Sequence, residues 1–398
     1  MSQQLPIYLD HHATTPLDTR VLDAMLPYFR EDFGNSSSAS HVYGWRAEAA
    51  VEAAREQLAN AIGAADPREI VFTSGTTESD NLALIGIARA NRDRLDHFVT
   101  TRIEHPAVID AARSLERDGF RVTYLPVDAD GLVDPGDVAA AIEERTALVS
   151  VMAANSEIGT LQPLEEIGRV CREREVPLHT DAAQAVGKIP LDVERLGVDL
   201  LSMCAHKLYG PKGIGALYLR SRRPRLRIEP LLHGGGHERG LRSGTLPVPL
   251  VVGFARAVTL CLEERDEEAV RLTALRRRLW DGLCTGLDGV LRNGHSEQRL
   301  PGNLNVSFEG IDAGHLLVAL PGVALSTGSA CASASAEPSH VLTALGLPGA
   351  RIRAALRFGL GRSTSADEID SVVAQVVAAV RETRKKRALG EFRRSGDR

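Results

Sequence analysis

The 398-residue chain lacks the features that mark secreted, membrane and nucleic-acid-binding proteins. No stretch approaches the roughly 18 uninterrupted apolar residues of a membrane span. The opening MSQQLPIYLD has neither the basic nor the apolar region of a secretory signal. The net charge is −5, so the composition indicates no attraction to nucleic acid or to a membrane surface. We therefore expect a cytoplasmic protein that binds neither directly.

Cysteine is also scarce, and its distribution is uneven. The five cysteines are an odd number without a CxxC pair, which argues against a disulfide framework and a zinc site: Cys171, Cys204, Cys261, Cys284 and Cys331. Cys331 stands apart, because it lies in LSTGSACASASAEPSH (325–340), among small and polar residues rather than the apolar neighbours of a structural cysteine. A lone thiol on a segment with the composition of a flexible loop requires an explanation.

Short apolar runs alternate with helical patterns over the first 220 residues. The runs predicted as strands are 69–73, 97–101, 121–125, 147–153, 176–181, 198–204 and 213–219. Several are almost continuously apolar, as buried parallel strands are. Helical patterns lie between them, for example at 47–63 and 164–176. Repeated βα units predict an α/β fold, with a mostly parallel sheet flanked by helices.

The pattern changes after about residue 247, and the chain is long enough for a second domain. A long helical stretch at 249–283 precedes widely spaced predicted strands at 303–308, 323–326 and 351–358. We predict a large domain over 17–250. A smaller α+β domain would comprise 1–16 and 251–398 and carry the Cys331 loop, at about 325–337. The basic tail 381–398 is expected to be solvated and frayed, with a docking site for an acidic partner as the alternative.

Two segments have a composition suited to holding a ligand at the carboxyl ends of predicted strands. In FTSGTTESDN (72–81) a strand leads into a helix whose first N–H groups, with Thr76 and Thr77, suit a phosphate. The alternative there is an ordinary Thr-capped helix. Asp181, in HTDAAQAVGKIP, ends a strand at the edge where α/β proteins bind ligands, and its carboxylate would pair with a protonated ring nitrogen. The alternative for Asp181 is a helix N-cap.

A lysine and two histidines add a second kind of chemistry. Lys207, in SMCAHKLYGPKG, follows a strand among small residues, and a partly desolvated lysine is a usable amine nucleophile. A solvated surface lysine is the alternative. His206 is a candidate donor to a phosphate, and His105, in IEHPAVID, a candidate to stack on a ring. Together, a lysine, an acid and a phosphate cradle describe a site for pyridoxal phosphate.

The motifs YLDHHATTP, FTSGTTESDN, EHPAVID, DAAQAVGK, AHKLYGPKGIGALY, HGGGHERGLRSGT and STGSACAS occur in this order from about Ile7 to Asp370. In this respect the chain resembles the NifS/IscS-like cysteine desulfurases, fold-type-I pyridoxal-phosphate enzymes of the class-V aminotransferase family. STGSACAS is similar to the group with a long cysteine loop. Departures from the family pattern are Cys204, where serine is usual and a thiol is a weaker donor, and the basic C-terminal tail.

The resemblance implies a reaction in which L-cysteine becomes L-alanine and its sulfur moves to Cys331 as a persulfide. Lys207 would carry the cofactor as a Schiff base and move the α-proton, with Asp181 keeping the ring electron-poor. Small residues beside Cys331 would let this thiol collect the sulfur and carry it to a partner.

The resemblance also implies a role for each remaining matched position. Thr76, Thr77, Cys204 and His206 match the phosphate cradle, and Gln184 matches the contact to the ring hydroxyl. Asn155 and Arg357 match the grip on the substrate carboxylate, for which a guanidinium is suited. Thr245 matches a residue that reaches the phosphate of the neighbouring subunit, which implies a homodimer.

The sulfur acceptor stays open between an iron–sulfur scaffold, a tRNA-thiolation carrier and a DNA-sulfur-modification partner. With a scaffold, Cys331 would be a candidate transient ligand to an iron–sulfur cluster. A selenocysteine lyase, a plain lyase or an aminotransferase on the same fold would not need Cys331. A non-enzymatic dimeric adaptor would be expected to lose Lys207, Asp181 or Cys331, and all three are present.

Overall fold

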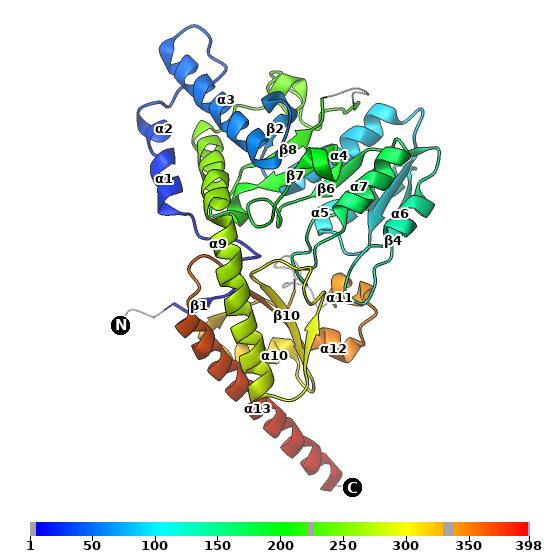
Figure 1. Cartoon of the computed structure of the whole chain (residues 1–398), viewed down its shortest axis with the longest axis vertical. Helices are drawn as coiled ribbons and strands as arrows, with labels where there is room; N and C mark the ends of the chain where they lie inside the picture. Colours follow the sequence, from blue (N-terminus) through cyan, green and yellow to red (C-terminus); the bar gives the residue numbers. More distant parts are fainter. Residues whose placement is uncertain (1–4, 222–225, 329–337, 397–398) are drawn as a thin grey trace.

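The computed structural model of the chain describes residues 5–221, 226–328 and 338–396, with those from 387 onward as helical backbone only. Cys331 and most of the predicted loop at 325–337 therefore lie outside the described residues. Figure 1 shows a larger layered part above a smaller one, with the long helix α9 (Val248–Gly286) running through both.

The larger part is built on a seven-stranded sheet in the order β2-β8-β7-β6-β5-β3-β4. The pairs between β7, β6, β5, β3 and β4 are parallel, and only β8 runs against its two neighbours. The strands are β2 (Ile70–Thr73), β3 (His97–Thr101), β4 (Arg121–Leu125), β5 (Thr146–Ser150), β6 (Leu178–Asp181), β7 (Leu200–Cys204) and β8 (Gly215–Leu219). The predicted α/β class with a mostly parallel sheet is confirmed.

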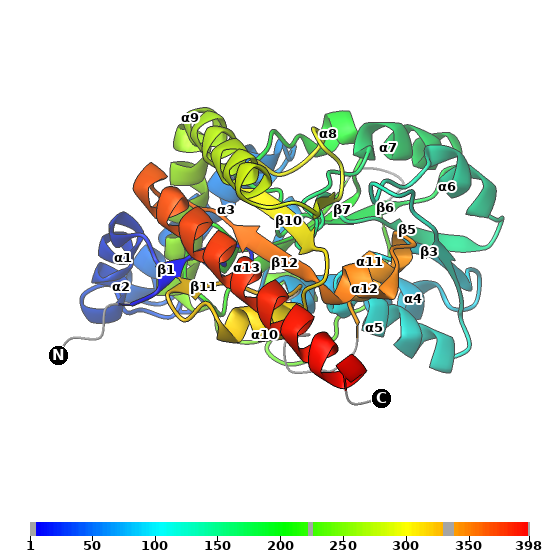
Figure 2. The same cartoon turned by 90° about the horizontal axis from the view of Figure 1, so that it is seen from below.

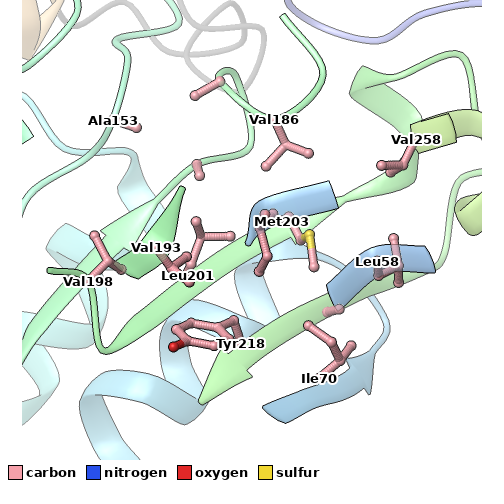
Figure 3. Close-up of a cluster of buried hydrophobic side chains, with 14 of the residues drawn as sticks. Leu58, Ile70, Ala153, Val186, Val193, Val198, Leu201, Met203, Tyr218 and Val258 are labelled. Carbon is pink, nitrogen blue, oxygen red and sulfur yellow. The ribbon is translucent and has the colours of Figure 1, made fainter. Parts of the chain in front are cut away.

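Both faces of this sheet are covered, which explains why its strands are nearly continuously apolar. Ile70 and Phe72 pack on one face, and Val71 between them packs on the other. The Val71 face carries α4 (Thr76–Asn91) and α5 (Pro106–Arg117). Figure 3 shows the cluster on the opposite face, where strand residues meet residues of α3 and α9: Ile70, Leu201, Met203, Tyr218, Leu58 and Val258.

The remaining helices of the larger part pack on the face that Ile70 shares. They are α1 (Thr19–Met25), α2 (Pro27–Arg30), α3 (Val42–Ile62), α6 (Pro135–Ala141), α7 (Leu164–Glu173) and α8 (Val193–Leu196). Three single 3₁₀ turns join the longer elements: η1 (Pro67–Glu69), η2 (Ala205–Lys207) and η3 (Glu238–Gly240).

The smaller part has an antiparallel sheet in the order β12-β10-β9, and a second hydrophobic core covers it. Its strands are β9 (Val290–Asn293), β10 (Asn303–Phe308) and β12 (Ala355–Gly359), with β1 (Ile7–Tyr8) and β11 (Val323–Ala324) as a separate parallel pair. Its helices are α10 (Ala313–Val318), α11 (His340–Ala344), α12 (Gly349–Arg353) and α13 (Ala366–Gly396). In Figure 2, seen from below, α13 crosses in front of β10 and β12.

Helix α9 contributes to both hydrophobic cores. Phe254 and Val258, in its first half, belong to the core of the larger sheet. Leu279 and Leu283, in its second half, belong to the core of the smaller one. The predicted domain boundary at residue 250 falls in the first turn of this helix. The division into two domains with that boundary stays a prediction.

Three local predictions from the sequence differ from the structure. The predicted strand at 351–358 begins as α12, because Pro348 starts a helical turn, and β12 starts only at Ala355. The tail expected to fray is helical backbone through Gly396. Strand β9 was not predicted, since its four residues have no clear periodicity and pair only through β10.

A buried ion pair joins α3 to the segment before α9. The Arg55 guanidinium donates two hydrogen bonds of 2.8 Å to the two carboxylate oxygens of Glu238, and the side chains are 3% and 2% exposed. Arg55 also donates to Ile70 O at 2.7 Å, and Glu238 accepts from the Phe72 N–H at 2.8 Å. The pair therefore ties α3 and the segment at Glu238 to strand β2.

Replacing Arg55 by methionine is expected to lower the free energy of unfolding by about 3–5 kcal/mol, because the Glu238 charge would remain buried without its partner. Urea unfolding of the purified variant measures this. The matched control is Asp32→Ala, since Asp32 pairs with Arg46 at the surface, where that arginine side chain is 62% exposed. Such a change costs about 1 kcal/mol or less. Equal losses in the two variants would contradict a structural role for the buried pair.

Candidate active site

A cavity of about 500 Å³ opens at the carboxyl ends of the parallel strands. Most of the side chains singled out from the sequence line it: Thr76, Thr77, His105, Asp181, Gln184, Cys204, His206, Lys207 and Arg357. They come from the starts of α4 and α5, from the ends of β6 and β7, and from β12 of the smaller sheet. The fold thus gathers residues from both parts of the chain into one site.

One end of the cavity is the N-terminus of α4. The N-cap of this helix is Gly75, which makes no side-chain capping bond, so the alternative of a Thr-capped helix is wrong. Strand β8 approaches closely here, since a Cβ at Gly215 would lie 2.6 Å from Gly75 Cα. The Thr76 hydroxyl is buried and has no hydrogen-bond partner among the described residues. Free helix N–H groups and an unpaired buried hydroxyl are the groups that a phosphate would satisfy.

Cys204 and His206 lie beside this helix terminus. Cys204 is the last residue of β7 and is buried, which raises the pKa of its thiol, so it faces the cavity as a neutral and weak donor. Burial lowers the pKa of His206 to about 4, so its ring is neutral at pH 7. His206 Nδ1 lies 3.2 Å from Thr14 Oγ1, within hydrogen-bond distance.

Lys207 ends the 3₁₀ turn η2 directly after β7. Its amine donates to the backbone carbonyls of His12 at 2.5 Å and Ala13 at 2.6 Å. Burial lowers the pKa of Lys207, so it is not the solvated surface lysine of the alternative. The N-terminal residues His12, Ala13 and Thr14 also line the cavity, and no role was predicted for them from the sequence. They belong to the motif YLDHHATTP, but nothing in that motif indicates that residues 194 and 195 positions from Lys207 lie against it.

Asp181 is the last residue of β6 and is buried. Turns rather than a helix follow it, and its Oδ1 accepts from the Ala183 N–H at 2.9 Å. Burial raises the pKa of Asp181, while the nearby His105 and Lys207 act to lower it. No cation in the described residues makes an ion pair with this carboxylate. A protonated ring nitrogen would supply that missing partner.

His105 is the N-cap of α5, and its Nδ1 accepts from the Ala107 N–H at 3.2 Å. Burial lowers the pKa of His105. The neutral ring therefore carries its proton on Nε2. Two further buried acids, Glu104 and Asp80, lie close to Asp181. Burial raises the pKa of Glu104 to about 8, so this acid is neutral at pH 7, and burial also raises the pKa of Asp80 well above its usual value.

Arg357 enters the cavity from the smaller sheet and is 1% exposed. It donates to Asp10 Oδ1 at 2.7 Å and to Ser156 O at 3.2 Å, and its buried Nε has no partner in the described part of the chain. Asn155 does not line the cavity. Its amide donates to Ile103 O at 2.9 Å and accepts from the backbone N–H groups of the turn that carries Ser156.

Two other predicted residues are not in the described lining of the cavity. Thr245 is exposed and does not line the cavity of its own chain. Cys331 lies outside the described residues, but both flanks of its segment are described. On one side, Ser326 O accepts from the Arg357 N–H at 2.8 Å. On the other, His340 Nε2 lies 2.9 Å from Glu104 O, next to His105. The segment therefore leaves and rejoins the described structure beside the cavity.

Neither a metal cluster nor a membrane span is found within residues 5–221, 226–328 and 338–396. In that part of the chain, no group of three or more histidine, cysteine, aspartate or glutamate side chains is placed to hold a metal ion. No helix there is long and apolar enough to cross a membrane.

Comparison with known proteins places the whole chain in one family. The model of the aminotransferase class-V family matches residues 7–372. The cysteine desulfurase IscS of Anaeromyxobacter sp. (strain Fw109-5) is 54% identical over 99% of this chain and 97% of its own length. A solved NifS-like protein superposes with a TM-score of 0.87 at 39% identity, covering 94% of this chain and 99% of that one. SspA in complex with cysteine gives a TM-score of 0.80 at 39% identity, covering 89% and 98%. Because the family model matches residues 7–372, the chain belongs to the aminotransferase class-V family.

Proposed function

We propose that this protein is a pyridoxal-phosphate-dependent cysteine desulfurase that forms L-alanine from L-cysteine and transfers the sulfur to Cys331. The observation that carries the proposal is that a half-buried lysine amine, a buried carboxylate, an open helix N-terminus and the Arg357 guanidinium meet in one cavity. The relatives named cysteine desulfurase and the SspA structure with cysteine support this choice of reaction and substrate.

The residues present fit the cofactor at each of its reactive ends. The unpaired Thr76 hydroxyl and the first N–H groups of α4 would hold the phosphate, with Thr77, His206 and Cys204 beside them. The unpaired Asp181 carboxylate would hold the ring nitrogen, and Lys207 would hold the cofactor covalently. When bound, the cofactor supplies an electron-poor ring that stabilises negative charge on the substrate α-carbon.

The protein's own groups would then bind the substrate and move its proton. Arg357 would bind the substrate carboxylate bidentately, and its contacts with Asp10 and Ser156 O hold the guanidinium in place. Asn155 supports this grip by bonding the turn that carries Ser156. The lowered pKa of Lys207 suits an amine that takes the α-proton and later returns it. His105 would cover the ring with a neutral imidazole.

Sulfur transfer would use Cys331 as a thiolate nucleophile. The thiolate forms an S–S bond with the substrate sulfur, the substrate C–S bond breaks, and its electron pair stays on carbon, which a proton then completes to alanine. The flanking contacts of Ser326 with Arg357 and of His340 with Glu104 support this role, because they start and end the Cys331 segment at the cavity. An iron–sulfur scaffold is the proposed acceptor, with Cys331 as a transient cluster ligand, and a cytoplasmic location is proposed with it.

We also infer that the enzyme is a homodimer with shared sites. Thr245 is exposed here, which suits a residue that acts in the neighbouring subunit. Arg242, three residues before it, pairs with Glu78 at the start of α4, so this segment adjoins the phosphate end of the cavity. Aromatic side chains exposed near α2 and the start of α3 would be covered by a second copy: Phe29, Phe33, Tyr43 and Trp45.

Replacing Lys207 by alanine is expected to abolish turnover and the covalent link to the cofactor. Borohydride reduction followed by mass spectrometry of the peptides measures the link. The matched control is Lys212→Ala, since Lys212 lines the same cavity but is exposed, and this variant should keep the link. Cofactor found attached to the Lys207→Ala chain after reduction would show that another amine carries it.

Replacing Cys331 by alanine is expected to leave cysteine binding intact, because Arg357, Asp181 and Lys207 remain. Cysteine should still shift the visible spectrum of the variant, but no persulfide and no catalytic sulfide should form. The control is Cys284→Ala, since Cys284 is an exposed thiol on α9. A wild-type rate of persulfide formation in Cys331→Ala would refute the transfer role of Cys331 and show that another thiol takes the sulfur.

A hybrid dimer tests whether the sites are shared. One protomer carries Lys207→Ala and the other Thr245→Ala, and two affinity tags isolate the mixed species. If Thr245 acts in the neighbouring subunit, the only site with an intact lysine also has an intact threonine and binds the cofactor with wild-type affinity. If Thr245 acts within its own chain, that site loses a hydrogen bond to a charged group and binds about tenfold more weakly. A monomer in sedimentation would contradict the dimer itself.

A further inference from the structure

Lys188 lies in the active-site region, but the proposed function assigns it no role. It closes the series of turns that follows Asp181, and its Nζ donates to Gln184 Oε1 at 2.8 Å. Within the described part of the chain, no carboxylate oxygen lies within ion-pair distance of this amine. A half-buried ammonium without an ionic partner is costly, because it loses solvation that one hydrogen bond replaces only in part. Its retention at this place therefore calls for a role.

The Lys188 amine decides which way the Gln184 amide faces. Gln184 Oε1 also lies 3.1 Å from His12 Nδ1, and Gln184 Nε2 donates to His12 O at 2.9 Å. A flipped amide would turn its NH₂ group toward an ammonium that can only donate. With the oxygen held by Lys188 and by the protonated His12 Nδ1, one N–H of Gln184 is left for the active-site cavity, which Gln184 lines.

The same hydrogen bonds connect Lys188 to the lysine that would carry the cofactor. His12 O accepts from Gln184 Nε2 and, at 2.5 Å, from Lys207 Nζ. Lys188, Gln184, His12 and Lys207 thus form one continuous series of hydrogen bonds. A change at Lys188 would reach the cavity through the Gln184 amide, although Lys188 does not itself line that cavity.

The surroundings of Lys188 keep its amine available for this contact. Burial lowers the pKa of Lys188 to about 8, and the charge of Lys207 acts in the same direction. Both lysines line a second, enclosed space of about 40 Å³, which His11, Cys261 and Glu268 also line. The ring nitrogens of His11 have no partner among the described side chains. Its lining is largely apolar, but Lys188, Lys207 and His11 place polar groups at its wall, and a space of this size has room for a water that would solvate the other N–H groups of Lys188.

We propose that Lys188 is a positioning residue that holds the Gln184 amide with its N–H toward the ring oxygen of the bound cofactor. The inference rests on the proposed function, because it concerns the same cofactor site. It assigns to Lys188 an effect on cofactor affinity and on the electronic state of the ring, both exerted through Gln184.

The test is a double-mutant cycle on cofactor affinity with Lys188→Met, Gln184→Leu and the combination. Affinity is measured by adding pyridoxal phosphate to the apoprotein, and the absorption maximum of the lysine-bound cofactor is recorded in each case. Lys188→Met is expected to weaken binding about tenfold, because an amide group loses its charged partner, and to shift the absorption maximum. In the Gln184→Leu background the same change should have no further effect, since its route to the ring is already removed.

Control variants keep the proposal open to refutation. Lys386→Met removes an exposed lysine on α13 and should leave affinity and spectrum unchanged. Lys188→Arg keeps a charged donor, and the space of about 40 Å³ beside Lys188 can take the larger guanidinium group. This variant should therefore bind the cofactor within about threefold of the wild-type affinity. It also serves if Lys188→Met does not fold. Wild-type affinity and spectrum in Lys188→Met, or equal losses in both Gln184 backgrounds, would overturn the proposal. Failure of the wild-type protein to bind pyridoxal phosphate would instead refute the proposed function.

Discussion

The candidate site depends on one constraint, the burial of both faces of the larger sheet. Because helices cover the two faces, ligands have access only at the edge where the parallel strands end. Asp181 and Cys204 are the last residues of β6 and β7, and Lys207 follows Cys204 by a single 3₁₀ turn. The register of these two strands therefore sets the distance between the acid and the amine, before any ligand is bound.

Low polarity at this edge determines which groups carry charge. Asp80 and Glu104 are less exposed than Asp181, and burial raises the pKa of each. His179 lies 3.6 Å from Asp80, but burial lowers the pKa of its ring to about 3, so it brings no charge at pH 7. Burial also raises the pKa of Asp181, but the charge of the nearby Lys207 acts to lower it, and a cationic ligand would act in the same direction. On the opposite wall, the buried Arg357 is held by Asp10. The Asp181 carboxylate and the Arg357 guanidinium, both in the lining of the cavity, match a cationic ring nitrogen and an anionic carboxylate.

The long helix α9 and the N-terminal segment keep the two halves of the site in register. Helix α9 belongs to both hydrophobic cores, so the sheet with Lys207 and the sheet with Arg357 share one rigid element. The N-terminal residues cross from one to the other. Gly359 N donates to Leu9 O at 2.7 Å in the smaller part, and Lys207 donates to His12 O in the larger. A third contact is the small apolar cluster in which Ile103 and Met152 meet Val341 and Leu342.

By itself the sequence determined the fold class and the motifs from which the site is assembled. Short, continuously apolar runs between helical patterns indicate buried strands, so the sequence predicted the parallel sheet and the polar residues placed where strands end. The tertiary structure alone decided which side chains face the cavity. Asn155 is a matched position, but its amide bonds Ile103 O and the turn that follows it rather than lining the cavity. Nothing in the sequence distinguishes Lys188 from other lysines, and only the structure shows that its amine donates to Gln184 Oε1. The place of His12 against Lys207 could not be predicted either, because a hydrogen bond across 195 residues leaves no local periodicity or composition to detect.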